Sequence, residues 1–570
     1  MAEEVWMLQT KKADFKQIGA RFRIDPVTAR IIRNRGIEGE AAIDRYLNGT
    51  LDDLYDPMLL KDMERAVSIL CEAVDTGKKI RIVGDYDIDG VCSTYILLQA
   101  FERLGSDVDF EIPDRIKDGY GINESIIEQA HADGVEVILT CDNGISAFHQ
   151  VELAKKYGMM VVITDHHEVP LDVEKEKIPP ADAVIDPKQA DCPYPFPEIC
   201  GAVVAYKLVQ VLYARRGVPQ MEWLDLLEFA AIATVGDVMK LQDENRILVK
   251  YGLKKMAQTK NLGLRRLAEK NNLDLEAITA YHIGFVIGPC LNAGGRLKTA
   301  KEALALLRAQ SEEEAERLAE ELKELNDTRK DMTEQGTEAA KLQVESWYQK
   351  DKVLVVFLPE CHESLAGIIA GRLREYYQKP AIVLTRGEEA VKGSGRSIDE
   401  YHMFKKLTEV SDLLLKFGGH PLAAGLSLEE KNIDEFRRRL NENAGLTEED
   451  FKAKVWIDVP MPVGYVTERL VRELSCLEPF GQGNEKPLFA EKSLRIRASR
   501  VLGRNRNVVK MTLEETDGHA IEALYFGDGT AFEEERAGRR EIDVVYYPDI
   551  NEYNGRKTLQ AVIRRYKFRG

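Results

Sequence analysis

The segment KIRIVGDYDIDG, residues 79–90, decides how the rest of the chain is interpreted. Its apolar run predicts a β-strand, and three carboxylates follow at alternate positions, Asp85, Asp87 and Asp89. Side chains at alternate positions of an extended segment point the same way, so these carboxylates would repel one another. Cations would neutralise them, and oxygen ligands suit Mg²⁺ or Mn²⁺. An acidic surface loop is the alternative, whereas an EF-hand is excluded because no Glu follows at the required spacing.

Apolar runs and helical stretches alternate from about residue 78 to residue 240. Strands are expected at Lys79–Val83, Val108–Ile112, Val135–Thr140, Met159–Thr164 and Ala181–Ile185, with helices such as Val91–Leu104 and Glu124–Ala132 between them. This alternation predicts an α/β domain built on a parallel sheet. Functional residues of such sheets gather at the carboxyl ends of the strands.

Three further motifs place acids or histidines at such ends: TCDNG (140–144), TDHHE (164–168) and ATVGD (233–237). Each is weak alone, since a single Asp can cap a helix and a pair of histidines is often on the surface. A histidine beside acids, however, offers an imidazole ligand whose tautomer a carboxylate can fix. Together the four motifs predict two divalent cations, Mn²⁺ or Mg²⁺, about 3.5–4 Å apart, that clamp a phosphate ester.

In this order, DYDIDG, CDNG, DHH and GD resemble motifs I to IV of the DHH phosphoesterase superfamily. The resemblance implies a set of metal ligands, namely Asp87, Asp89, Asp142, His166 and Asp237, with Asp142 bridging and Asp85 as a ligand or an outer partner. It also implies two catalytic residues. His167 would contact the scissile phosphate or the attacking water, and Asp165 would orient a histidine.

Other blocks resemble the RecJ family of exonucleases within that superfamily. They are Ile112–Arg115 with Asp118–Gly121, Cys192–Phe196, Gly288–Leu297 and Leu477–Asn484. In the third block Gly294 stands where Ala is usual. The resemblance runs from about residue 5 to the end of the chain, so it does not depend on one motif.

A long helix and a second α/β unit are expected after the first. The helix should cover residues 310–346, and Val353–Leu358, Leu365–Tyr377 and Ala381–Leu384 should form strand, helix and strand. The motifs GSGRS (393–397) and GGHPLAAG (418–425) in this unit resemble the DHH-associated domain. That resemblance, with the glycine-rich block before residue 297, implies a set of substrate-binding residues that grip a 5′-phosphate: Arg115, Arg296, Ser394, Arg396, Gly419 and His420.

Residues 491–570 hold five short strands separated by turn signals, which suggests an OB-fold barrel. This end carries 16 Lys and Arg against 13 Asp and Glu, whereas the whole chain carries 79 against 96. Such barrels bind single strands through basic grooves and aromatic stacking. Candidate contacts are Arg504, Arg506, Lys510, Tyr553 and Arg556.

The bulk composition sets the limits of these interpretations. A chain of 570 residues predicts several domains, which we expect at 1–70 (packed on the catalytic domain), 71–308 (DHH catalytic domain), 309–346 (connecting helix), 347–450 (DHH-associated domain) and 451–570 (OB-fold). A net charge of −17 argues against a protein coated with positive charge, although a local basic channel is compatible with it. The apolar runs are too short for a membrane span, no signal peptide is evident, and the eight scattered cysteines suit a reducing, cytoplasmic location.

The resemblance implies a 5′→3′ exonuclease specific for single-stranded DNA, which releases 5′-mononucleotides and acts in recombination and repair. It further implies single-strand binding protein and a RecQ-type helicase as partners. One alternative keeps the chemistry and changes the substrate: an oligoribonuclease or a cyclic-dinucleotide phosphodiesterase of the DHH type. A second is a catalytically silent binding protein, which predicts lost ligands, although every metal motif is intact.

Overall fold

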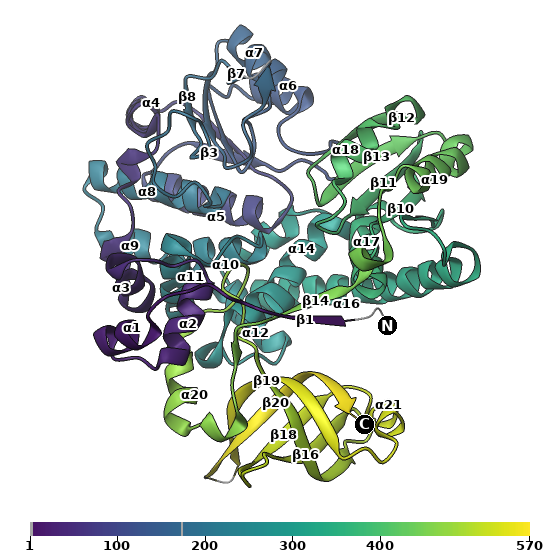
Figure 1. Ribbon diagram of the computed structural model, residues 1–570. Coiled ribbons are helices and arrows are strands. Elements are labelled where there is room, and N and C mark those ends of the chain that lie inside the picture. The colour runs from purple at the N-terminus through teal and green to yellow at the C-terminus, as the bar shows by residue number, and fades with distance from the viewer. Residues whose placement is uncertain (1–3, 173–174, 554, 570) are drawn as a thin grey trace. The chain divides into compact units, whose positions relative to one another are not determined.

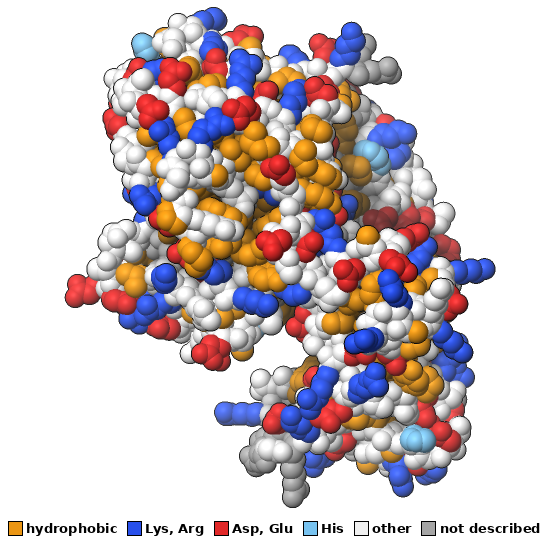
Figure 2. All heavy atoms as spheres, turned by 90° about the vertical axis from the view of Figure 1, so that its left-hand side faces the viewer, with side chains coloured by type: hydrophobic (Ala, Val, Ile, Leu, Met, Phe, Trp, Pro, Cys, Tyr) orange, Lys and Arg blue, Asp and Glu red, His pale blue; other side chains and the backbone are white. Residues whose placement is uncertain are grey.

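The computed structural model describes residues 4–172, 175–553 and 555–569, apart from the side chains of Tyr553 and Arg556. The chain divides into two compact units. The first contains Tyr55–Met239 and Tyr251–Ala453, and the second contains Val5–Leu54, Lys240–Lys250 and Lys454–Gly570. Acidic and basic side chains are interspersed over the face in Figure 2.

The first unit begins with a five-stranded sheet whose order is β3-β2-β4-β5-β8 and whose strands are all parallel. The strands are β2 (Ile80–Val83), β3 (Val108–Glu111), β4 (Val137–Cys141), β5 (Met160–Thr164) and β8 (Ala183–Ile185). Each lies within one to two residues of its predicted position. The four strands β2, β4, β5 and β8 are almost wholly buried, which explains why their sequences are continuous apolar runs.

Helices cover this sheet on both faces (Figure 1). Apolar residues of α6 (Glu124–Ala132) and α7 (Phe148–Lys156) share a core with β2, β4 and β5. Helices α5 (Ile88–Arg103) and α8 (Gly201–Arg216) pack against each other and against the strands. Further helices that contact them are α4 (Met63–Asp75), α10 (Leu227–Gly236) and α15 (Lys301–Arg308).

Several shorter helices lead to the long helix predicted from the sequence. They are α11 (Asp243–Met256), which is divided between the two units, α12 (Leu262–Lys270), α13 (Ala280–His282), the π-helical segment η4 (Ile283–Ile287) and α14 (Gly288–Leu297). The long helix itself is α16 (Glu312–Gln343), followed by a second π-helical segment, η5 (Val344–Tyr348). Its predicted apolar stripe is buried at Ala315, Leu318 and Leu322, where α16 packs on α12, α14 and α15.

A second five-stranded sheet, of order β12-β13-β11-β10-β9, follows α16. Its strands are β9 (Leu354–Phe357), β10 (Ala381–Arg386), β11 (Val391–Arg396), β12 (Leu414–Gly419) and β13 (Ala423–Leu428). Only β9 and β10 are parallel, and the other pairs are antiparallel. Helix α17 (Ala366–Tyr377) packs with α16 on one face, and α18 (Met403–Thr408) and α19 (Ile433–Glu442) pack on the other.

The second unit contains the predicted OB barrel. Its strands are β15 (Val459–Pro460), β16 (Phe489–Leu502), β17 (Val508–Glu514), β18 (Ala520–Phe526), β19 (Glu541–Tyr553) and β20 (Arg556–Arg569), with α21 (Gly529–Arg536) between β18 and β19. The barrel closes because β16 pairs with both β17 and β19. The expectation of short strands was wrong for β16, β19 and β20, which have 13 or 14 residues.

The N-terminal segment departs from the expectation that it packs on the catalytic domain. Its elements are β1 (Glu4–Leu8), α1 (Phe15–Phe22), α2 (Pro26–Asn34) and α3 (Glu40–Asn48). Ile32 and Tyr46 share a hydrophobic core with Leu477 and Phe489, near α20 (Glu468–Leu474), and β1 pairs with β14 (Ala453–Ile457). Residues 5–54 therefore belong to the second unit, because the buried face of α2 and α3 is completed by residues far along the chain.

The short segment Lys240–Lys250 also belongs to the second unit. Arg246 is buried there, and its guanidinium donates to the carbonyl oxygens of Tyr46, Leu477 and Cys476 at 3.0, 2.8 and 2.7 Å. Five donors on one side chain can satisfy several backbone carbonyls at once. This arginine therefore ties together three parts of the chain that are distant in sequence.

No helix within the described ranges combines the length and the apolar character that crossing a membrane requires.

Candidate active site

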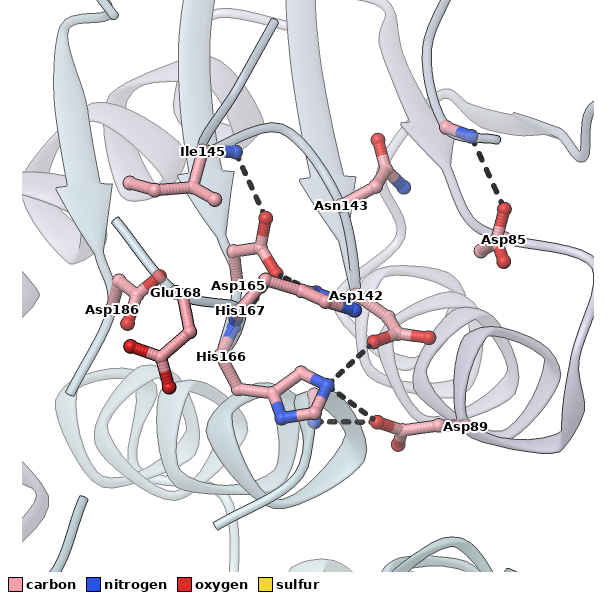
Figure 3. A network of polar contacts seen from close by, with 12 residues as sticks. Asp85, Asp89, Asp142, Asn143, Ile145, Asp165, His166, His167, Glu168 and Asp186 are labelled. Carbon is pink, nitrogen blue, oxygen red and sulfur yellow. Dashed lines mark hydrogen bonds and ion pairs between the residues drawn. The ribbon is translucent and has the colours of Figure 1, made fainter. Parts of the chain in front are cut away.

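Acidic residues follow directly after four neighbouring strands of the first sheet. Asp85 follows β2 with only Gly84 between them, and Asp142, Asp165 and Asp186 come directly after β4, β5 and β8. The strands are parallel and in register, with Val83 opposite Thr140 and Thr164 opposite both Cys141 and Ile185. All four carboxylates are buried at one edge of the sheet (Figure 3).

Backbone N–H groups hold the other two acids of the first motif. Asp87 caps α5, accepting from the N–H groups of Asp89 and Gly90 at 3.0 and 3.1 Å. The two oxygens of Asp89 accept from the N–H groups of Gly201 and Ala202, at 2.7 and 2.8 Å, where α8 begins. A helix N-terminus favours negative charge, so α8 stabilises this buried carboxylate.

Glycines allow these segments to approach so closely. A Cβ on Gly90 would lie 2.4 Å from the carbonyl oxygen of Asp85, and one on Gly201 would lie 2.7 Å from Cβ of Asp142. Neither neighbour is the end of a flexible side chain. The tight packing of backbone therefore explains why glycine stands at both positions.

The structure brings all six predicted metal-ligand residues together in two groups that meet at Asp142. In the first group, ligand atoms of Asp85, Asp87 and Asp142 lie within 4.8 Å of one another. In the second, atoms of Asp89, His166 and Asp237 do so. Nε2 of His166 lies 3.0 Å from Oδ1 of Asp142, which brings that carboxylate into the second group as well (Figure 3).

The electrostatics of this cluster favour cations. Burial, and then the charge of Asp87, raises the pKa of Asp85 well above its usual range, and burial with the charges of Asp89 and Asp87 does the same for Asp142. The pKa of Asp237 is raised to about 8 by burial and by the same neighbours. Burial lowers the pKa of His166, which keeps its imidazole neutral, as a metal ligand must be.

The donor set fits hard divalent cations. Oδ2 of Asp85 is buried and has no hydrogen-bond partner among the described residues, and the same carboxylate faces other acids. Oxygen-rich sites with one imidazole suit Mn²⁺ or Mg²⁺. The arrangement can hold two such ions that share Asp142.

His167 lies at this cluster, with a ring nitrogen within 4.8 Å of ligand atoms of Asp142 and His166, and it is hydrogen-bonded to a buried acid. Nδ1 of His167 lies 2.7 Å from Oδ1 of Asp165, which also accepts from the N–H of His166 at 2.7 Å. Burial disfavours the charged imidazole, but the hydrogen bond and charge of Asp165 outweigh it and raise the pKa of His167 to about 9. Burial likewise opposes ionisation of Asp165, yet the hydrogen bond from His167 leaves its pKa lowered. In the cation-free protein the pair is therefore an imidazolium and a carboxylate at neutral pH.

Three residues of this site were not predicted from the sequence: Tyr120, Asn143 and Asp186. The hydroxyl of Tyr120 donates to the carbonyl oxygen of Asp142 at 2.7 Å and lies 3.1 Å from Nε2 of His167. The amide of Asn143 donates to the carbonyl oxygens of Val83 and Cys141, at 3.1 and 2.9 Å, and so ties the ends of β2 and β4 together.

Asp186 repeats the signal used for the other acids. It follows an apolar strand directly, and burial with the charge of Asp165 raises its pKa to about 7. The sequence AVID (183–186) could therefore have been recognised by the same rule.

A cleft of about 580 Å³ lies beside the cluster in the first unit. Its lining includes Tyr86, which stands between Asp85 and Asp87, and four cations: Arg115, Arg296, Lys392 and Arg396. The guanidinium of Arg115 lies over the ring of Tyr86, 4.7 Å from its centroid. The predicted residues Arg115, Arg296, Ser394 and Arg396 are thus brought together.

The electrostatics of the cleft favour binding of an anion. Burial, and then the charges of Arg115 and Arg329, lowers the pKa of Arg296 to about 10, and burial with Arg115 and Arg374 lowers the pKa of Arg396. Arg296 donates to the carbonyl oxygen of Ser364 at 2.9 Å, and Arg396 donates to Oγ of Ser394 at 3.1 Å. The cations in this partly buried cleft repel one another, and a bound phosphate would relieve that repulsion. A guanidinium group can bind phosphate with two parallel hydrogen bonds.

Gly419 and His420 do not line this cleft. Gly419 ends β12 opposite Ala424, and His420 is exposed, with its N–H donating to the carbonyl oxygen of Ala423 at 2.7 Å. Strand β13 lies between β12 and the strand that carries Ser394 and Arg396. The structure supports a turn for this motif, since a Cβ on Gly419 would lie 2.4 Å from the carbonyl oxygen of Ala423.

Two of the candidate barrel contacts have partners of their own. Arg506 donates to Oγ1 of Thr530 at 2.9 Å, and Lys510 pairs with Glu522 at 2.9 Å. Arg504 is exposed. The side chains of Tyr553 and Arg556 lie outside the described residues. The contact of these five residues with nucleic acid stays a prediction.

Three family models match the chain. They are the DHH family N-terminal domain at residues 79–234, the DHHA1 domain at 350–445 and the RecJ OB domain at 457–565. The single-stranded-DNA-specific exonuclease RecJ of Bacillus subtilis is 36% identical over 564 residues, covering 98% of this chain and 70% of that protein. The Escherichia coli protein of the same name is 34% identical and covers 95% of each chain. This chain therefore belongs to the RecJ family.

Solved structures agree with this assignment. The RecJ of Thermus thermophilus in complex with Mn²⁺ has a TM-score of 0.84 and 28% identity, covering 99% of this chain and 79% of that one. The same protein in complex with Mg²⁺ has a TM-score of 0.77.

Proposed function

We propose that this chain is a metal-dependent exonuclease that degrades single-stranded DNA from the 5′ end, releases 5′-mononucleotides and acts in recombination and repair. One observation carries the proposal. The carboxylate cluster and the arginine cleft meet at Tyr86, which lines the cleft while its neighbours Asp85 and Asp87 belong to the cluster. A terminal phosphate in the cleft would thus lie near a phosphodiester at the cluster.

The proposed ligands divide between two cations. Asp85, Asp87 and Asp142 would hold one, and the second would be held by Asp89, Asp142, His166 and Asp237. When bound, two such cations polarise a phosphodiester and lower the pKa of an attacking water. The carboxylates need little rearrangement for this, because the N–H groups of α5 and α8 already hold Asp87 and Asp89.

The other residues position the substrate. The imidazolium of His167, oriented by Asp165 and close to the hydroxyl of Tyr120, can donate a hydrogen bond to a phosphate oxygen as negative charge develops there. Arg296, Ser394 and Arg396 would grip the 5′-phosphate, with Arg115 closing one side. Fixing the terminal phosphate sets which phosphodiester reaches the cluster, which accounts for release of one nucleotide at a time.

An oligoribonuclease or a cyclic-dinucleotide phosphodiesterase is the second candidate. It is favoured less, because the C-terminal barrel is matched by the RecJ OB domain and the relatives bear the name of a single-stranded-DNA-specific exonuclease. A barrel of this kind suits a long single strand.

The test uses a single strand with a 5′-phosphate, labelled at either end, and the same strand in a duplex, all with Mn²⁺. We expect mononucleotides from the 5′ end of the single strand and slow attack on the duplex. Release from the 3′ end, or duplex degradation at a similar rate, would refute the polarity or the strand selectivity. Faster turnover of dinucleotides than of the long strand would favour the second candidate.

The cellular setting is proposed on the family resemblance. Single-strand binding protein and a RecQ-type helicase are the proposed partners, in the cytoplasm. Retention of purified single-strand binding protein by the immobilised chain, in the absence of DNA, would support the first of these contacts. Apart from that of the N-terminal segment, the sequence-based domain boundaries, including the catalytic domain at 71–308, are likewise proposed.

A further inference from the structure

A second cleft, of about 470 Å³, lies among the helices of the first unit and shares no lining residue with the arginine cleft. We name it the Glu228 cleft. Its walls include Tyr95 on α5, Tyr213 on α8 and Phe229 on α10. The ring centroids of Tyr95 and Phe229 lie 4.3 Å apart, and both side chains are largely buried. A cleft of this size with partly aromatic walls is typical of small-molecule sites.

The cleft contains a carboxylate that is only half satisfied. Glu228 is 4% exposed, and its Oε1 accepts from the hydroxyl of Thr259 at 2.8 Å. Its Oε2 is buried and has no hydrogen-bond partner among the described residues. A carboxylate withdrawn from water in this way is costly, and burial raises the pKa of Glu228 to about 7. A ligand that donates a hydrogen bond to Oε2 would offset this cost.

The outer part of the cleft carries more positive than negative charge. Besides Glu228, it is lined by four cationic and two acidic side chains: Arg103, Lys255, Lys260, Arg308, Glu222 and Asp225. The side chain of Lys260 is 88% exposed, and its Nζ lies 3.7 Å from Asp225. This excess of cations would repel a ligand that is only cationic and would attract an anionic group. The favoured ligand therefore joins hydrogen-bond donors to a negative charge.

From these observations we propose that the Glu228 cleft is a regulatory site for a guanine nucleotide, with the base against Glu228 and the phosphate near Lys260. Among the four bases of DNA, only guanine presents two adjacent donors on its Watson–Crick edge, N1–H and the 2-amino group, and a carboxylate can accept from both. Adenine and cytosine present a ring-nitrogen acceptor there, which a carboxylate repels. The aromatic walls suit a flat base. The proposal goes beyond the proposed function and does not depend on it.

Three helices connect the Glu228 cleft to the carboxylate cluster. Helix α5 carries Asp89 in its first turn, and its C-terminal half lines the cleft. Helix α8 begins at Gly201, whose N–H donates to Asp89, and reaches the cleft at Tyr213. Helix α10 runs the opposite way, with Glu228 in its first turn and Asp237 directly after its end. The three helices pack against one another (Figure 1).

This packing explains why occupancy of the cleft would act on the cluster. Asp237 stands nine residues after Glu228, or roughly 13 Å along an α-helix. A Cβ on Gly236 would lie 2.6 Å from Cγ2 of Ile88, so α10 and α5 are in tight contact beside the cluster. A shift of α10 at the cleft would therefore be felt by two elements that carry proposed metal ligands. Coupling between two sites is reciprocal, so cations and nucleotide would change each other's affinity by the same factor.

The experiment measures binding of GMP, IMP, AMP and guanosine to the full chain by titration calorimetry in chelator. IMP keeps N1–H but lacks the 2-amino group, and AMP lacks both donors. Every titration is repeated in Arg396→Gln, because the arginine cleft accepts a phosphate whatever the base. Glu228→Gln and Lys260→Gln are compared with the control Glu128→Gln, whose side chain is exposed on α6.

We expect GMP to bind more tightly than IMP, and IMP more tightly than AMP, in Arg396→Gln as in the wild type. Glu228→Gln should weaken GMP binding roughly ten- to hundred-fold, as the loss of a charge-assisted hydrogen bond predicts. Lys260→Gln should weaken binding of GMP but not of guanosine, and Glu128→Gln should behave like the wild type. Guanosine has no phosphate to bind a cation, and its affinity should change by roughly five-fold or more when Mn²⁺ is added.

Equal affinities for GMP and AMP in Arg396→Gln, or a GMP affinity that Glu228→Gln leaves unchanged, would overturn the assignment of the ligand. A guanosine affinity that is the same with and without Mn²⁺ would overturn the regulatory role. If Glu228→Gln does not fold, the comparison of GMP, IMP and AMP decides the assignment without it. Failure of the proposed function is distinguishable, because none of these titrations uses DNA.

Discussion

Nε2 of His166 lies 3.0 Å from Oδ1 of Asp142, so the ends of two neighbouring strands, β4 and β5, meet at one pair of side chains. The same nitrogen lies 3.5 Å from Oδ2 of Asp89 at the start of α5. One neutral imidazole thus stands between carboxylates from two other elements. Removing negative charge here should have opposite effects on activity and on the stability of the cation-free protein.

Replacing Asp142 by Asn should abolish most of the activity. The amide keeps the shape of the side chain but removes the charge that both proposed cations share, and we expect a loss of at least about 100-fold with Mn²⁺. The melting temperature in chelator should stay equal or rise, because a buried carboxylate with a raised pKa is gone. The control is Asp172→Asn on exposed β6 (Leu171–Asp172), and full activity of Asp142→Asn would contradict the assignment.

Cation binding should release protons. In the cation-free protein the pKa of Asp237 is raised to about 8, so this group carries a proton at pH 7 that a cation must displace. Its contribution to proton release should therefore be present at pH 7 and lost as the pH rises above 8. Titration calorimetry with Mn²⁺ in two buffers of different ionisation enthalpy measures this release. Identical heats in both buffers at pH 7 would disprove it.

Changing Arg396 to Gln should reduce the preference for a 5′-phosphate. A charge-assisted hydrogen bond contributes about 1.5–3 kcal/mol, so kcat/KM for the phosphorylated strand should fall roughly ten- to hundred-fold relative to the 5′-hydroxyl strand. Arg386→Gln is a matched control on β10, because its side chain is exposed, pairs with Glu430 and does not line the cleft. Equal losses on both strands would mean that Arg396 does not contact the terminal phosphate.

Gly201→Ala should damage the site, whereas Gly371→Ala should be harmless. A Cβ on Gly201 would lie 2.7 Å from Cβ of Asp142, so α8 or the carboxylate must shift and activity should fall at least ten-fold. On α17 a Cβ on Gly371 meets nothing within 4 Å, and alanine there should stabilise by about 0.5–1 kcal/mol. Activity assays and melting curves of both variants check this, and unchanged activity of Gly201→Ala would contradict it.

Burial of Glu228, which is not among the proposed metal ligands, predicts that the stability of the protein depends on pH. Burial raises its pKa from 4.5 to about 7, so between these values the folded protein holds a proton that the unfolded chain has lost. The free energy of unfolding should therefore fall as pH rises from about 4.5 to 7, by at most about 3 kcal/mol. Glu228→Gln removes this dependence and should become progressively more stable than the wild type over that interval.

Melting temperatures measured from pH 5 to pH 8 test the Glu228 prediction, with exposed Glu128→Gln as the control. A difference between wild type and Glu228→Gln that stays constant with pH would contradict it.

The sequence predicted the first sheet and its acidic edge because both are local signals. Each strand is an apolar run, and each ligand follows such a run or caps the helix after it, as Asp87 and Asp142 do. Asp186 obeys the same rule and was missed because no motif drew attention to it. The role of Tyr120 depends on a loop that folds back on Asp142, and sequence spacing does not reveal such a contact.

Long-range packing could not be predicted in the same way. The motif around His420 was grouped with Arg396 by resemblance, yet a strand separates them. Local periodicity in the sequence does not determine the order of strands in a sheet. Arg246 looks like an ordinary surface residue of an amphipathic helix. Only the assembled core shows that its guanidinium is buried against three carbonyl oxygens.

Arg246 and Tyr46 have a consequence for biosynthesis. Their partners Leu477 and Cys476 are made by the ribosome only after more than two hundred further residues have followed Arg246. During translation the N-terminal helices therefore emerge first but must wait, with their apolar face uncovered, until the last part of the chain arrives. Shortened chains that end before residue 454 would keep that face exposed for good and should be prone to aggregation.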